Sequence, residues 1–160
     1  MLRALFLTDS ADLDTAAVAL ETLTRLNELH LAQHEEPPLY KSGVVWIPPP
    51  DCIQFCEQDW PTIPIVRQRG KAPCNALAPW RAAELRKRGY PLATAFPIIV
   101  PGPPPPAPTQ MHAVVTRDGT IGGLEDPSAR LGMPPMPHEQ LVTLARAHLR
   151  FLSPRCTHWR

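Results

Sequence analysis

Proline constrains the folds open to this chain more than any other feature of its sequence. It supplies 22 of the 160 residues, whereas proline usually makes up about 5% of a protein. Each proline lacks an amide hydrogen and has a fixed φ angle, so prolines interrupt helices and interior strands. The chain therefore cannot consist mainly of long helices. Residues 37–70 hold several prolines among aromatic and β-branched residues, which predicts extended segments and turns with a short helix around 59–68.

Helical periodicity is present near both ends of the chain. Leucines recur at helical spacing in residues 10–34, and Ser10 with Asp12 and Asp14 is typical of a helix start. This predicts an N-terminal helix over 10–34, which ends before the prolines that follow it. Leucines at the same spacing predict a C-terminal helix over 137–152.

A third amphipathic segment follows Cys74, in the sequence CNALAPWRAAELRKRG. Gly89 is suited to close this helix, and the basic residues of its last turn favour the negative end of the helix dipole. Pro79 leaves two alternatives for the helix start. A helix that runs from Asn75 places Pro79 in its interior, at a cost of about 3 kcal/mol. A start at Ala78 makes Pro79 a first-turn proline and leaves Cys74 in the preceding loop.

Strand-like segments follow this helix at residues 92–100, 111–117 and 120–126, the last two joined by an Asp-Gly turn. They predict an antiparallel sheet. The proline run PGPPPPAP at 101–108 is predicted to be a loop between strands. It is alternatively a docking segment, which would make the protein a proline-rich adaptor. We therefore expect one α+β domain over residues 1–160, with the cysteine-bearing helix packed on a small antiparallel sheet.

Charge and apolar patterning exclude several functional classes. The chain has 16 basic and 15 acidic residues, a balance that gives no reason to expect a nucleic-acid partner. No apolar run approaches the roughly 18 residues of a membrane span, and the N-terminal run is too short for a signal peptide. Four cysteines, at positions 52, 56, 74 and 156, are few for a secreted disulfide scaffold, so reduced thiols are expected. Cys52, Cys56, Cys156 and His158 lack zinc-knuckle spacing, so no metal is predicted.

Cys74, His112 and Asp126 form the candidate catalytic set. A thiolate is a strong nucleophile, and both a helix N-terminus and a nearby imidazolium favour it. His112 lies in an apolar strand and Asp126 at the end of the next one, so pairing of the two strands would let the acid orient the imidazole. The alternatives are a histidine near the core and an Asx-type turn before Pro127.

The order of these residues resembles the core of the transglutaminase-like and papain-like cysteine peptidase superfamily. The segments PPLYKSGV, DWPTIPIVRQRG, CNALAPWRAAELRKRGYPL, MHAVV and LEDPSARLGM, within residues 37–133, together are similar to small transglutaminase-like proteins of tailed bacteriophages and prophages. The resemblance implies Cys74 as nucleophile, His112 as base and Asp126 as the residue that orients the base. It implies acyl transfer without a metal or an organic cofactor.

The residues around the cysteine depart from that group, whose usual GDCEDLA is replaced by APCNALA. Pro73 removes an amide before the cysteine, and Ala72 lacks the conformational freedom of glycine. We therefore expect a structural or assembly protein of a phage virion with an eroded catalytic frame. It would be made in the host cytoplasm and lie against other phage structural proteins in an oligomeric assembly, without a membrane partner. The alternative is an active phage cysteine hydrolase that uses the three residues.

Overall fold

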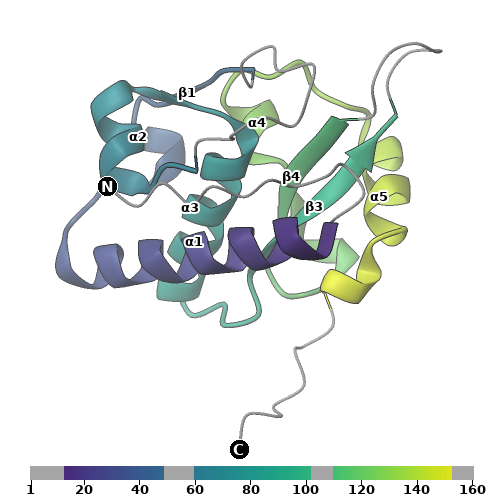
Figure 1. Cartoon of the computed structure of the whole chain (residues 1–160), viewed down its shortest axis with the longest axis horizontal. Coiled ribbons are helices and arrows are strands. Elements are labelled where there is room, and N and C mark those ends of the chain that lie inside the picture. Colours follow the sequence, from purple (N-terminus) through teal and green to yellow (C-terminus); the bar gives the residue numbers. More distant parts are fainter. Residues whose placement is uncertain (1–12, 49–59, 102–109, 153–160) are drawn as a thin grey trace, which may run out of the picture.

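A small antiparallel sheet lies between two layers of helices in the computed structural model, which describes residues 13–48, 60–101 and 110–152 (Figure 1). In spatial order the strands are β3 (Thr94–Val100), β4 (Gln110–Thr116) and β5 (Leu124–Glu125). The fold is thus α+β with helices packed on a small antiparallel sheet, as the sequence predicted.

Helices cover both faces of this sheet. On one face lie α1 (Leu13–Gln33) and α3 (Cys74–Lys87). On the other lie α5 (His138–Arg146) and the 3-10 turn η3 (Leu149–Phe151). No helix in the described part of the chain is both long enough and apolar enough to span a membrane.

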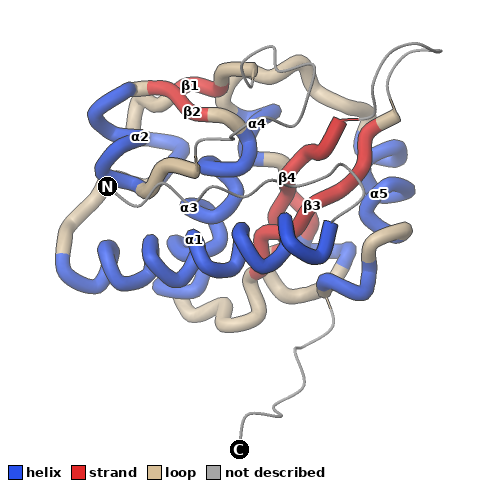
Figure 2. Tube along the Cα trace, in the orientation of Figure 1, coloured by secondary structure: helices blue, strands red, loops and turns tan. Residues whose placement is uncertain are grey.

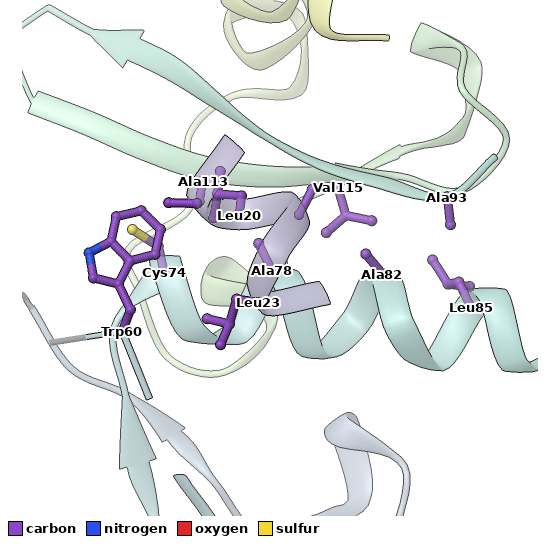
Figure 3. Close-up of a cluster of buried hydrophobic side chains, with 12 residues drawn as sticks. Leu20, Leu23, Trp60, Cys74, Ala78, Ala82, Leu85, Ala93, Ala113 and Val115 are labelled. Carbon is purple, nitrogen blue, oxygen red and sulfur yellow. The ribbon is translucent and has the colours of Figure 1, made fainter. Parts of the chain in front are cut away.

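Strands β3 and β4 pair along their whole length, and their side chains alternate between the two faces. The face toward α1 and α3 is rich in small residues, which let the Cys-bearing helix approach closely (Figure 3). The cluster there includes Ala78, Ala82, Ala95, Ala113 and Val115. The face toward α5 is made of larger side chains, among them Phe96, Ile98 and Val114, and Leu141 of α5 belongs to the same cluster.

A second pair of strands lies on the side of α3 away from this sheet. β1 (Val45–Trp46) and β2 (Lys71–Ala72) pair in parallel, with α2 (Ile63–Arg69) between them in the chain (Figure 2). Together with the 3-10 turn η1 (Leu39–Lys41), they surround a cluster that α3 completes with Ala76, Leu77, Trp80 and Ala83. The sequence predicted extended segments and a short helix here, but not this pairing.

Several predicted boundaries differ from the observed ones. The C-terminal helix ends at Arg146 instead of residue 152. The chain turns there because the His148 amide donates to the Ala145 carbonyl, while the His148 ring accepts from the Ile99 amide of β3. The predicted N-terminal helix is observed from Leu13, and its first three residues, like nearly all of the proline run, lie outside the described residues.

The segment after β4 holds less strand than predicted. Residues 120–126 were predicted as a strand, but only Leu124–Glu125 pair with β4. Asp118 folds the preceding turn, because its Oδ1 accepts from the amide and the hydroxyl of Thr120, and η2 (Ile121–Gly123) follows. The short helix α4 (Pro127–Arg130) comes directly after Asp126 and was not predicted.

Candidate active site

Helix α3 begins at Cys74. The preceding Pro73 is extended, with φ −79° and ψ 170°, and its carbonyl accepts from the amides of Ala76 and Leu77 at 3.1 and 3.2 Å. Cys74 therefore lies in the first turn of α3, at the positive end of the helix dipole. The alternative start at Ala78, with Cys74 in a loop ahead of the helix, is wrong.

Pro79 is consequently an interior residue of α3. It cannot donate to the Asn75 carbonyl, and in a helix interior this costs about 3 kcal/mol. Residues 74–80 are all buried, however, including the large side chains of Leu77 and Trp80. Each such side chain contributes about 1.5–3 kcal/mol when it is removed from water. Packing of this turn between two apolar clusters therefore offsets the proline penalty.

His112 and Asp126 meet at the edge of the sheet. The Nε2–H of His112 donates to Oδ2 of Asp126 over 2.8 Å. His112 is near the start of β4, and Asp126 directly follows β5, which pairs with β4 through Glu125 opposite Val115. The strand pairing expected from the sequence thus brings the two side chains together.

Asp126 also caps helix α4. Its Oδ1 accepts from the amides of Ser128 and Ala129, at 3.0 and 3.3 Å. The two uses that the sequence left open for this residue, a bond to the histidine and an Asx-type turn before Pro127, therefore occur at once. Because both oxygens are engaged, the carboxylate is held in one orientation behind the imidazole.

Cys74 is the second partner of His112. Its side chain interacts with the imidazole and favours the protonated ring. Asp126 already occupies Nε2, which leaves Nδ1 as the ring nitrogen available to the thiol. Burial is the largest influence on the pKa of His112 and lowers it. Hydrogen bonds and negative charge from Asp126 and Cys74 outweigh burial and raise the pKa of His112 to about 10. The imidazolium form is thus favoured between the thiol and the carboxylate.

The three side chains lie under the surface. Cys74, His112 and Asp126 are 8%, 7% and 8% exposed. Cys74 belongs to the apolar cluster between α1, α3 and the sheet, where it shares one end with Trp60 and Ala113 (Figure 3). The partly buried Met111, which precedes His112, packs against the same cluster. A carbonyl group that reached Cys74 would meet mainly apolar surroundings.

Two features of the site were missed by sequence reasoning. Trp60 lies beside the cysteine, and nothing in its local sequence indicates that position. Helix α4 had a usable signal, because Asp126, Pro127 and Ser128 form the acceptor–proline start that is typical of a helix N-terminus.

No metal-binding cluster of three or more His, Cys, Asp or Glu side chains occurs among the described residues. Cys52, Cys56, Cys156 and His158, which were considered as metal ligands, lie outside the described ranges, so the structure does not test them.

Comparisons with known proteins give no relative for this chain. No family model, curated protein or solved structure matches it. The functional argument therefore depends on the chain's own residues.

Proposed function

We propose that the protein is a cysteine-dependent acyl hydrolase or acyltransferase, with Cys74 as nucleophile, His112 as general base and acid, and Asp126 as the residue that orients His112. The observation that carries the proposal is the position of His112, which hydrogen-bonds to the carboxylate of Asp126 at 2.8 Å and whose protonated form is favoured by the side chain of Cys74. A likeness to the transglutaminase-like core, which the sequence suggested, is part of the same proposal.

The reaction follows from the positions of these groups. The Cys74 thiolate attacks the carbonyl carbon of an ester or amide, which forms a carbon–sulfur bond and places negative charge on the carbonyl oxygen. The first-turn amides of α3 favour that charge. When the intermediate collapses, His112 gives its proton to the departing alcohol or amine, and a thioester remains on Cys74. Water or an amine then attacks the thioester, His112 takes up the proton, and the thiolate is restored.

Acetylation by p-nitrophenyl acetate tests the proposal. We expect the protein to release p-nitrophenolate in a burst at pH 7 and to carry the acetyl group on Cys74, located by peptide mapping so that the other three cysteines are distinguished. His112→Gln is expected to slow this step by about 10²-fold or more, the range of a lost general base. His34→Gln, at an exposed histidine directly after the end of α1, is the matched control. Acetylation of Cys74 at equal rates in all three proteins would refute the proposal.

A structural role in a phage virion is the second candidate, and the burial of the site favours it. All three side chains are less than 10% exposed, which is compatible with a hydrogen-bonded cluster that only stabilises the fold. In this proposal the chain is an assembly component that contacts other phage structural proteins. Quantitative mass spectrometry of purified particles from the phage or induced prophage that encodes it provides the test. Absence of the chain from mature particles would exclude this role.

A further inference from the structure

Arg81 joins the helix that carries Cys74 to the strand that leads to Asp126. Its Nε donates to Oε1 of Glu125 at 2.8 Å, and its Nη2 lies 3.5 Å from Oε2 of the same carboxylate. Glu125 directly precedes Asp126 in the chain. Arg81 follows Cys74 by seven residues, which is about two turns, so both residues project from the same side of α3. The proposed catalytic set and this ion pair are therefore neighbouring links between α3 and the end of β5.

The alignment of the catalytic set depends on how three elements are fixed to one another, because Cys74, His112 and Asp126 come from α3, from β4 and from the end of β5. Pairing of β5 with β4 sets Asp126 relative to His112. The bond from Arg81 to Glu125 sets the same segment relative to α3, and thus relative to Cys74. A misplacement of about 1 Å can slow a reaction by about 10²-fold, so a restraint at this point matters to the site.

The ion pair is suited to this role because neighbouring side chains confine it. The side chains of Arg81 and Glu125 are 11% and 20% exposed. Nη1 of Arg81 donates to Oε2 of Glu84 at 2.8 Å, and the hydroxyl of Tyr40 donates to Oε2 of Glu125 at 3.2 Å. The Tyr40 ring also packs against the guanidinium, with its centroid 4.7 Å from Cζ of Arg81. Exposed ion pairs restrain little, whereas a planar guanidinium held by two carboxylates has a fixed orientation.

We propose that Arg81 is a positioning residue, whose ion pair with Glu125 holds the adjoining Asp126 where it binds His112 opposite Cys74. Arg81 acts through Glu125 and takes no part in the bond changes of the reaction. The inference rests on the proposed function only for its effect on acyl transfer, because the alignment of His112 with its two partners can be measured without a substrate.

Two variants with opposite changes of charge test the proposal in the full-length protein. The readouts are NMR titration of the His112 ring and acetylation of Cys74 by p-nitrophenyl acetate. Arg81→Met removes a positive charge, which by itself would raise the pKa of His112, whereas Glu125→Gln removes a negative charge, which by itself would lower it. Loss of alignment lowers the pKa in both variants, because the bond to Asp126 favours the imidazolium form. We therefore expect both midpoints to fall from about 10 toward 6.5, and acetylation to slow by about tenfold or more in both.

Two further variants keep this test decisive. Arg86 is the matched control, since it lies on the same helix, is 9% exposed and pairs with two carboxylates of α1 instead of β5. Arg86→Met should therefore leave the His112 midpoint and the acetylation rate unchanged. Arg81→Lys keeps the charge without the planar geometry, so it should restore part of the rate, and it serves if Arg81→Met does not fold. Unchanged midpoints, shifts of opposite sign in the Arg81 and Glu125 variants, or an equal effect of Arg86→Met would overturn the proposal.

The two readouts separate failure of this proposal from failure of the proposed function. Lowered midpoints in Arg81→Met and Glu125→Gln, without acetylation of Cys74 even in the unmodified protein, would support the positioning role and reject acyl transfer. Acetylation that is lost in His112→Gln but normal in Arg81→Met, with a normal midpoint there, would support acyl transfer and reject the positioning role.

Discussion

The two ends of helix α3 both bury ionisable groups, but they combine them differently. Toward its C-terminal end, Arg86 binds Glu21 at 2.8 Å and Glu28 at 3.1 Å. One turn earlier, Arg81 contacts Glu84 and Glu125, each at 2.8 Å. At the N-terminal end, Cys74, His112 and Asp126 form a more deeply buried cluster, each 7–8% exposed, whereas the Glu21 and Glu28 side chains are 18% and 26% exposed.

Perturbed ionisation alone does not distinguish these two ends. The pKa values of Arg86 and His112 are both raised, since burial opposes the charge in each case and is outweighed by hydrogen bonds to carboxylates and, at His112, to Cys74. At the C-terminal end the groups are guanidinium and carboxylate partners that join α3 to α1 and β5. Only the N-terminal end holds a nucleophile beside a group that can accept and donate a proton. A candidate site is therefore recognised by its chemistry, and burial or a shifted pKa is supporting evidence.

We expect the largest effect on stability from removal of the carboxylate of Glu84, which forms ion pairs in the C-terminal half of α3. Glu84 accepts from Arg81, from Arg88 and from the buried Leu39 amide. Glu84→Ala leaves these donors without that carboxylate, so we expect the free energy of unfolding to fall by about 3 kcal/mol. Urea denaturation measures the loss. Arg25→Ala, at a mostly exposed ion pair of α1, should cost about 0.5 kcal/mol or less. Equal losses in the two variants would contradict this account.

Substitutions of Asp126 test the cluster at the N-terminal end of α3. This residue both caps helix α4 and accepts a hydrogen bond from His112. Asp126→Ala loses both, and we expect a destabilisation of about 2 kcal/mol. Asp126→Asn can keep its Oδ1 on the amides of Ser128 and Ala129, so a smaller loss of about 1 kcal/mol is expected. If the new side chain keeps its oxygen on those two amides, only its NH2 group faces His112, and this group cannot accept from Nε2–H. The imidazole tautomer with its proton on Nδ1 is then favoured, and that tautomer cannot accept a proton from Cys74. Acetylation of Cys74 should therefore fall similarly in both variants. Normal acetylation in Asp126→Asn would remove Asp126 from the proposed mechanism.

A smaller effect on stability is expected from pH. The pKa of His112 is raised from 6.5 to about 10, so the native state keeps a proton that the unfolded chain releases. This contribution to stability is fully present below about pH 6.5 and is lost as the pH rises through about 10. The thiol of the unfolded chain also titrates within this range, so the net fall in unfolding free energy should be modest.

NMR titration of the His112 ring isolates this ionisation from the others. We expect a midpoint near 10. In Cys74→Ala the midpoint should be lower, because the contribution of the Cys74 side chain to the raised pKa of His112 is removed. A midpoint near 6.5 in the unmodified protein would contradict the proposed interaction between these side chains.

Parts of the fold that depend on local pattern were predictable from the sequence. Gly89 closes α3 as expected, with φ +95° and with the Tyr90 amide on the Leu85 carbonyl. The apolar periodicity located α1, and the alternating segments located β3 and β4. The end of α5 and the short β5 were not predictable, because hydrogen bonds accepted by the His148 ring and the Asp118 carboxylate decide them.

The sequence by itself determined which chemistry is present: one cysteine before a helix, one histidine in an apolar strand, and an Asp-Pro step after the next strand. Tertiary structure decided whether these groups meet. Burial of the first turns of α3 on two sides holds the helix start at Cys74 despite Pro79. Strand pairing brings Asp126 to His112, and packing places Trp60 beside Cys74 in the core. Local sequence sets backbone preferences that range from less than about 1 kcal/mol for most residues to about 3 kcal/mol for proline. The burial of several large side chains together is strong enough to override them.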